Sequence, residues 1–286
     1  MRLFRAELLK MRHRTMTFVL LITMLVVMAL VFLVIGSLVG GILGEVESLP
    51  GSTDFVPWRV GGAFVGDFVF GGLGTLLAVI YAGGIVGGDY SWGVLRNTIA
   101  RGESRERYML AKAAAIGLLV IIGAAITFVG GMVMIAIAAT VSRFDLGTLT
   151  VETMVQLAGG WGLGTLVLLE RAAIAIAVAT MLRSQLAGIV VAVILYVAEP
   201  IIGGVLSIVG SIDAFDPMRE PTVHWSQFLP FSIGGSVAAE GYVSLPALVP
   251  QLTATVPLGQ AVPVVLLYTA GALGLAMLVM RRQEIT

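Results

Sequence analysis

Long apolar runs, with few charges inside them, limit what this chain can fold into. Residues 18–39 carry no charged side chain, and similar runs cover residues 68–88, 113–140, 154–182, 186–208 and 261–280. A transmembrane helix needs about 20 consecutive, mostly apolar residues. A soluble domain carries about 25% charged residues, whereas this chain carries 12% and is 58% hydrophobic. We predict an all-α integral membrane protein with six transmembrane helices, forming one domain over residues 1–286.

The distribution of basic residues predicts the orientation of these helices. With six spans, thirteen Lys and Arg residues fall on one side, three fall on the other, and Arg171 lies within a span. Basic residues concentrate on the cytoplasmic side of membrane proteins. We therefore expect both termini and residues 89–112 to be cytoplasmic, and residues 210–260 to be extracytoplasmic. The expected location is the cytoplasmic membrane of a prokaryote.

Residues 1–14 combine a cationic face with an apolar one. Leu3, Phe4, Leu8 and Met11 recur at helical spacing among basic side chains. Such a helix lies in the membrane interface, although a basic flank that only orients the first span would account for the same charges.

Four glycines mark one face of the second predicted span. Gly83, Gly84, Gly87 and Gly88 form two overlapping pairs of small residues four positions apart. This spacing lets a neighbouring helix approach closely, and a hinge is the alternative interpretation.

The sequence lacks the motifs of several common catalytic and metal sites. There is no phosphate-binding Gly-x-x-x-x-Gly-Lys-Ser/Thr loop, no cysteine, and only His13 and His224 as histidines. Histidine and cysteine metal sites are therefore excluded. We expect no enzymatic activity, no metal and no nucleic-acid partner for this chain.

Three charged residues fall inside predicted spans: Glu170, Arg171 and Glu199. A charge at the bilayer centre costs at least about 3 kcal/mol and is usually paired or faces a cavity. Neighbouring residues on a helix point in different directions, so we expect Arg171 to pair with Glu199 rather than with Glu170. The pair would fix helix register, line a substrate path or act as a latch.

Residues 89–112 form a charged segment between two apolar runs. Residues 92–97 fit a short amphipathic helix at the membrane surface, and residues 101–107 alternate arginine with glutamate. Mixed charge favours a surface that a protein partner recognises, and a solvated loop with local salt bridges is the alternative.

The order of these features resembles the permeases of type-2 ABC exporters. The resemblance rests on Glu7-Leu8-Leu9-Lys10, the six spans, Glu199, Leu229-Pro230, and the loop Gly88-Asp89-Tyr90-Ser91-Trp92-Gly93-Val94-Leu95-Arg96 that continues through Arg101, Ser104 and Arg105 to Lys112. It covers essentially the whole chain.

The resemblance implies a membrane subunit that couples to a separate ATP-binding cassette ATPase, where ATP and Mg²⁺ would bind. It also implies a second permease copy or a related permease, in contact with membrane lipid. The implied coupling residues are Asp89, Tyr90, Trp92, Arg96, Arg101, Glu103, Arg105, Glu106, Arg107 and, on a second turn, Arg183. The alternatives are a secondary transporter that uses Glu170, Arg171 and Glu199, and a membrane sensor or scaffold.

The outer segment contains an apolar stretch that begins at Phe228. Proline and glycine interrupt it too often for a membrane span. We expect a re-entrant or interfacial piece that either gates the outer mouth or caps the bundle.

Overall fold

The computed structural model describes residues 2–46, 57–100, 102–142, 146–210, 225–241 and 256–283. All regular secondary structure in these ranges is helical. The elements are α1 (Arg2–Arg12), α2 (Thr15–Val46), α3 (Pro57–Gly66), the π-helical η1 (Asp67–Gly71), α4 (Leu73–Ser91), α5 (Val94–Ala100), α6 (Arg105–Ser142), α7 (Val151–Leu182), α8 (Gln185–Gly210), the 3₁₀-helical η3 (Trp225–Phe228), α9 (Pro230–Gly241) and α10 (Leu258–Arg282).

Five segments of the described chain are long and apolar enough to cross a membrane. They are Thr15–Val34, Gly61–Ser91, Arg105–Val141, Val151–Leu182 and Leu258–Arg282. The predicted span at residues 186–208 lies in α8, whose described apolar part, Gln185–Glu199, is shorter than these. The protein is therefore an all-helical, multi-pass membrane protein, and the sixth span stays a prediction.

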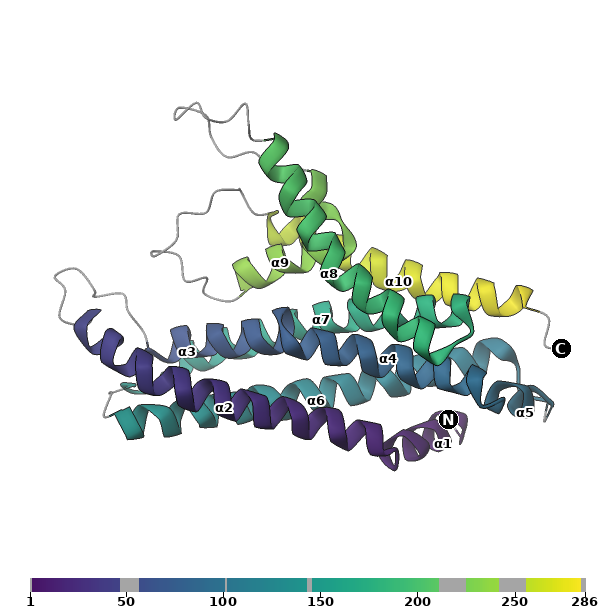
Figure 1. Cartoon of the computed structure of the whole chain (residues 1–286), viewed down its shortest axis with the longest axis horizontal. Helices are drawn as coiled ribbons and strands as arrows, with labels where there is room; N and C mark the ends of the chain where they lie inside the picture. Colours follow the sequence, from purple (N-terminus) through teal and green to yellow (C-terminus); the bar gives the residue numbers. More distant parts are fainter. Residues whose placement is uncertain are drawn as a thin grey trace.

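The candidate spans run side by side in an elongated bundle, from which α8 leans away (Figure 1). α2 packs against α6, α4 packs against α7 and α8, and α10 packs against α7. A main apolar core joins these helices, and a smaller one lies between α7, α9 and α10. α1, α5 and the C-terminal end of α10 lie at the same end of the bundle (Figure 1).

Two predicted boundaries were wrong. The third span was expected to begin at residue 113, but α6 begins at Arg105, so the last charged residues of the segment 89–112 are already helical. Glu199-Pro200 within the run of residues 186–208 predicts an interruption of the fifth span, but α8 continues through both residues to Gly210. A proline inside a helix removes one hydrogen bond and can bend the helix without ending it.

The second span is interrupted where no break was predicted. η1 ends at Gly71, and Gly72 adopts φ −103° and ψ −120°, outside the helical region, before α4 begins. Asp67, the first residue of η1, lies inside the candidate span Gly61–Ser91. The interruption leaves backbone carbonyls that side chains must satisfy.

The glycine face of α4 packs closely against neighbouring helices, as predicted. A Cβ atom on Gly87 would lie 2.6 Å from the Cα atom of Gln185 and 2.7 Å from the carbonyl oxygen of Ser184. A Cβ atom on Gly83 would lie 3.5 Å from the backbone of Gly188. The turn between α7 and α8 therefore lies directly against the backbone of α4.

Replacing Gly87 with alanine is expected to destabilise the protein by about 1–3 kcal/mol, the usual cost of overpacking, because backbone atoms cannot rotate out of the way. Thermal unfolding in detergent measures the effect. Gly162→Ala on α7 is the matched control, since a Cβ atom there has no neighbour within 4 Å. Equal melting temperatures for the two variants would contradict the proposed close contact.

Candidate functional site

A buried carboxylate, Asp89, lies at the centre of a charge cluster at the α5 end of the bundle. Asp89 belongs to the last turn of α4 and is 2% exposed. Its Oδ2 atom forms an ion pair with Lys112 and accepts a hydrogen bond from the hydroxyl of Tyr108, both on α6. Its Oδ1 atom accepts hydrogen bonds from Lys10 at 3.1 Å and from Arg14 at 3.0 Å. One carboxylate thus joins α1, α4 and α6.

A second carboxylate, Glu7 on α1, completes the cluster. Its Oε2 atom lies 3.3 Å from Nζ of Lys112, and its Oε1 atom lies 3.9 Å from Nζ of Lys10. Lys112 is 1% exposed, so it depends on these two carboxylates for its charge partners. Burial lowers the pKa of Lys10 below its ordinary value, while Glu7 opposes that shift. The cluster of Glu7, Lys10, Arg14, Asp89 and Lys112 therefore carries two acidic and three basic groups.

Helical spacing brings the side chains of this cluster together on α1 and on α6. Glu7 and Lys10 are three residues apart on α1, and Tyr108 and Lys112 are four residues apart on α6. Residues at these spacings share one face of a helix. Residues 1–14 were expected to form an interfacial helix or a basic flank, and the partners of Asp89 were not predicted, although the lone glutamate among basic residues was a usable signal.

The surface beside the cluster is formed by α5 and the residues that flank it. Gly93 and Gly102, on either side of α5, have φ values of 66° and 87°, which favour glycine. Trp92 is 66% exposed, and the guanidinium of Arg14 lies 5.2 Å from the centre of its ring. Glu103 and Arg107 are exposed. The short helix predicted at residues 92–97 is observed as α5, slightly later in the chain.

Other residues of the predicted coupling set hold the bundle together. Arg105 donates hydrogen bonds to the last carbonyls of α10, those of Met280 at 3.2 Å and Arg281 at 3.3 Å. Glu106 forms an ion pair with Arg281 at 2.6 Å. Tyr90 donates a hydrogen bond to the side chain of Gln283 at 3.2 Å. The beginning of α6 is therefore tied to the end of α10.

The structure separates the predicted coupling residues into different environments. Trp92, Glu103, Arg107 and Arg183 are exposed, whereas Asp89 is buried. Arg183 ends α7 in a left-handed conformation with φ 51°. Arg96 lies on α5, and Arg101 lies outside the described residues. The exposed side chains are accessible to a partner, whereas Asp89 contacts only side chains within the bundle among the described residues.

Arg171 lies in a second polar site, at the interruption of the second span. Its Nη1 atom donates hydrogen bonds to the carbonyl oxygen of Phe70 at 2.8 Å and to the hydroxyl of Thr75 at 2.7 Å. Its Nη2 atom donates to the carbonyl oxygen of Phe231 at 3.2 Å. Tyr196 on α8 donates to the carbonyl of Gly71 at 2.7 Å. Arg171 and Tyr196 thus satisfy the carbonyls of Phe70 and Gly71 beside the break, as irregular backbone at membrane depth requires.

Glu199 binds the N-terminus of α9 instead of Arg171. Its Oε1 atom accepts hydrogen bonds from the backbone nitrogens of Phe231 at 2.6 Å and Ser232 at 3.2 Å. The predicted direct ion pair is wrong, since the described residues contain none between Arg171 and Glu199. Free N–H groups at a helix N-terminus attract a carboxylate, and backbone carbonyls occupy the guanidinium. The two side chains instead hold the same residue: Arg171 binds the carbonyl oxygen of Phe231, and Glu199 binds its backbone nitrogen.

Glu170 is the least exposed charged residue of the described chain, at 0%. Neither of its carboxylate oxygens has a hydrogen-bond partner among the described residues. The three intramembrane residues therefore have different surroundings: Arg171 and Glu199 bind backbone groups, and Glu170 does not.

The comparisons with known proteins identify one family. No curated protein matches the sequence. The profile of a family described as "Protein of unknown function (DUF2705)" matches residues 60–232, from α3 to the beginning of α9. The matched region includes Asp89, Arg171 and Glu199, but it includes neither α1 nor α10. Because the match covers more than half of the chain, this protein belongs to the DUF2705 family.

Proposed function

We propose that this chain is the membrane subunit of an ABC exporter and that the surface around α5 receives a separate ATP-binding cassette ATPase. The observation that carries this proposal is the Asp89 cluster. It joins α1, α4 and α6 directly beside an exposed surface that contains Trp92, Glu103 and Arg107. A conformational change in a partner is transmitted only through an element that is firmly held. The cluster supplies that connection.

The proposal includes the finer topology expected from the sequence. Six spans, including α8, cross the cytoplasmic membrane of a prokaryote, with both ends of the chain and α5 in the cytoplasm. α1, α5 and the end of α10 lie at one end of the bundle (Figure 1), which supports a common side for the two termini. A second copy or a related permease completes the transporter, and the partner ATPase binds ATP and Mg²⁺.

Affinity purification of the tagged chain, expressed with its own operon, is expected to recover a stoichiometric ATP-binding cassette protein. Reversing two exposed charges, Glu103→Lys together with Arg107→Glu, should remove that protein, because complementary charge sets partner choice. The matched control is Glu152→Lys, an exposed reversal at the beginning of α7. A chain that purifies alone and folded, or a double variant that keeps its ATPase, would refute the proposal.

The interruption of the second span favours a second candidate, a secondary transporter. Such transporters place ion and substrate sites at discontinuous helices. Here α3, η1 and α4 meet at a break held by Arg171. Next to Arg171 in the sequence is Glu170, whose carboxylate has no hydrogen-bond partner within the described ranges. Transport driven by an ion gradient without ATP would favour this candidate over the first.

A further inference from the structure

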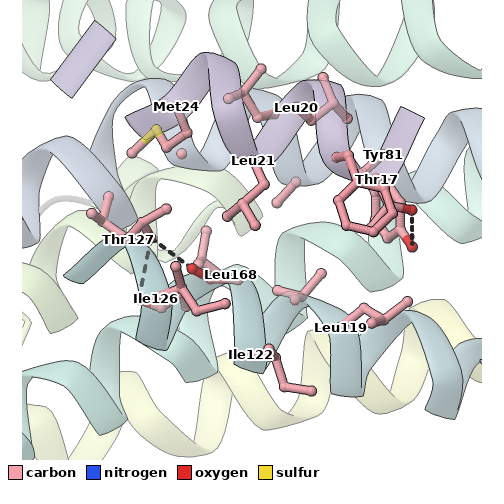
Figure 2. Close-up of a pocket in the computed structure, with 18 of the residues that line it drawn as sticks. Thr17, Leu20, Leu21, Met24, Tyr81, Leu119, Ile122, Ile126, Thr127 and Leu168 are labelled. Atoms are coloured by element: carbon pink, nitrogen blue, oxygen red, sulfur yellow. Dashed lines mark hydrogen bonds between the residues drawn. The ribbon is translucent and has the colours of Figure 1, made fainter. Parts of the chain in front are cut away.

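A cavity of about 490 Å³ lies between α2, α4 and α6, apart from both polar sites. Figure 2 shows Leu21 and Met24 of α2 facing Leu119 and Ile126 of α6 across it. The volume falls within the range of about 300–1,000 Å³ that is typical of small-molecule sites. Nearly all of its lining side chains are aliphatic or aromatic. The contents must therefore be largely hydrocarbon.

The cavity reaches the side of the bundle that faces lipid. Its lining includes Phe18, Ile122 and Ile126, which are 51%, 44% and 44% exposed. Its inner wall includes Val69 and Leu168, which are 1% and 3% exposed. A hydrocarbon chain can therefore enter sideways from the membrane and end against the core.

Polar groups gather where the cavity meets α1. The hydroxyl of Thr17 donates a hydrogen bond to the carbonyl of Met11 at 2.7 Å and lies 3.4 Å from the hydroxyl oxygen of Tyr81. Arg12 also lines this end, is exposed, and has no ion-pair partner among the residues described. Away from this end, the hydroxyl of Thr127 is satisfied by the carbonyl of Gly123 at 2.8 Å. The cavity thus has one cationic end and an otherwise apolar interior.

We propose that this cavity binds one acyl chain of an anionic phospholipid, whose headgroup lies at Arg12. The shape supplies a site for hydrocarbon, and the guanidinium of Arg12, which has no ion-pair partner in the described part of the chain, supplies a counterion for a phosphate. Basic pockets between membrane helices select anionic headgroups in this way. The inference does not depend on the ATPase partnership, because the lining contains none of the exposed residues around α5.

Gly123 offers a direct way to fill the site. It lines the cavity, and a Cβ atom there would have no neighbour within 4 Å. Gly123→Leu should therefore direct a side chain into the space of the acyl chain, with a Cβ atom that meets no neighbour, and Gly123→Ala should fill that space in part. Gly162→Leu is the control, because Gly162 also has open space but lies outside the cavity. For the charge, Arg12→Gln is paired with Arg5→Gln, an exposed residue of α1 that does not line the cavity.

Native mass spectrometry of the whole chain, released from bilayers of phosphatidylglycerol mixed with equal phosphatidylcholine, tests the proposal. The expected result is one retained lipid, mostly phosphatidylglycerol, which Gly123→Leu removes and Gly162→Leu keeps. Arg12→Gln should reduce the preference for phosphatidylglycerol about fivefold, which corresponds to about 1 kcal/mol for one basic residue at an anionic surface. Arg5→Gln should keep that preference.

Three outcomes would overturn the proposal: retention of the lipid by a folded Gly123→Leu variant, no headgroup preference in the native chain, or retention of detergent alone. If Gly123→Leu does not fold, as judged by size-exclusion chromatography and circular dichroism, Gly123→Ala decides. If the Gly123→Ala variant then retains as much lipid as the native chain, the proposed site is wrong.

Discussion

Replacing Asp89 with asparagine is expected to destabilise the protein by about 3–5 kcal/mol, the cost of removing one partner from a buried ion pair. The amide has nearly the shape of the carboxylate but lacks its charge. Lys112, at 1% exposure, would then keep only Glu7 as its counterion. Lys10 and Arg14 would lose their common acceptor as well. The contacts of α1 with α4 and α6 should weaken together.

Thermal unfolding in detergent, with loss of the monodisperse peak on size-exclusion chromatography, measures this effect. Glu103→Gln is the control, because it neutralises an exposed carboxylate of the same charged segment. The double variant Asp89→Asn, Lys112→Met should be more stable than the two single changes predict, since it removes both charges of the pair. Additive losses would show that the two residues do not interact.

Replacing Arg171 with leucine is expected to release α9 from the bundle. The variant would remove the guanidinium donor from the carbonyl of Phe231 on α9, whereas the carbonyl of Phe70 would keep its hydrogen bond from the hydroxyl of Thr75. Each hydrogen bond to a charged group contributes about 1.5–3 kcal/mol, so the loss of even one should raise the population with α9 undocked by about tenfold or more. Lysine cannot substitute for Arg171. The two terminal nitrogens of the guanidinium reach acceptors on η1 and on α9 at the same time, and a single ammonium does not reproduce this geometry.

A single engineered thiol can report this release, because the chain contains no cysteine. Ser236 on α9 is 6% exposed, so Ser236→Cys should react slowly with a maleimide while α9 is docked. Adding Arg171→Leu should accelerate the labelling by about tenfold or more. Arg183→Leu, at the exposed end of the same helix, should leave the rate unchanged. An unchanged rate in the Arg171→Leu variant would mean that the guanidinium does not hold α9.

The positions of the long helices could be predicted because apolar length is a local property. The fourth span was expected at residues 154–182 and is observed as Val151–Leu182, and the last was expected at 261–280 and is observed as Leu258–Arg282. The glycine face of α4 was also predictable, since four small residues at helical spacing have few other roles in a membrane helix.

The partners of the charged residues could not be predicted in the same way. Lys10 and Arg14 meet Asp89 across 79 and 75 residues of sequence, and no local pattern encodes which segments come together. Arg171 was expected to bind a carboxylate because charge is visible in a sequence. The structure gives it backbone carbonyl groups instead, one at Phe70 beside the break of the second span and one at Phe231 on α9.

The order of the Asp89 cluster along the chain also bears on how the protein is made. Glu7, Lys10 and Arg14 leave the ribosome first, Asp89 follows, and Lys112 comes last. The carboxylate of Asp89 therefore emerges when two of its cations are already present, and Lys112 emerges when both of its anions are. Each charge that this site buries after α1 therefore emerges when a counterion is already present, so the site itself holds no uncompensated charge during helix-by-helix insertion. In a chain synthesised without residues 1–14, Asp89 would lack the charges of Lys10 and Arg14. Its carboxylate would then wait for its counterion until Lys112 on α6 is synthesised.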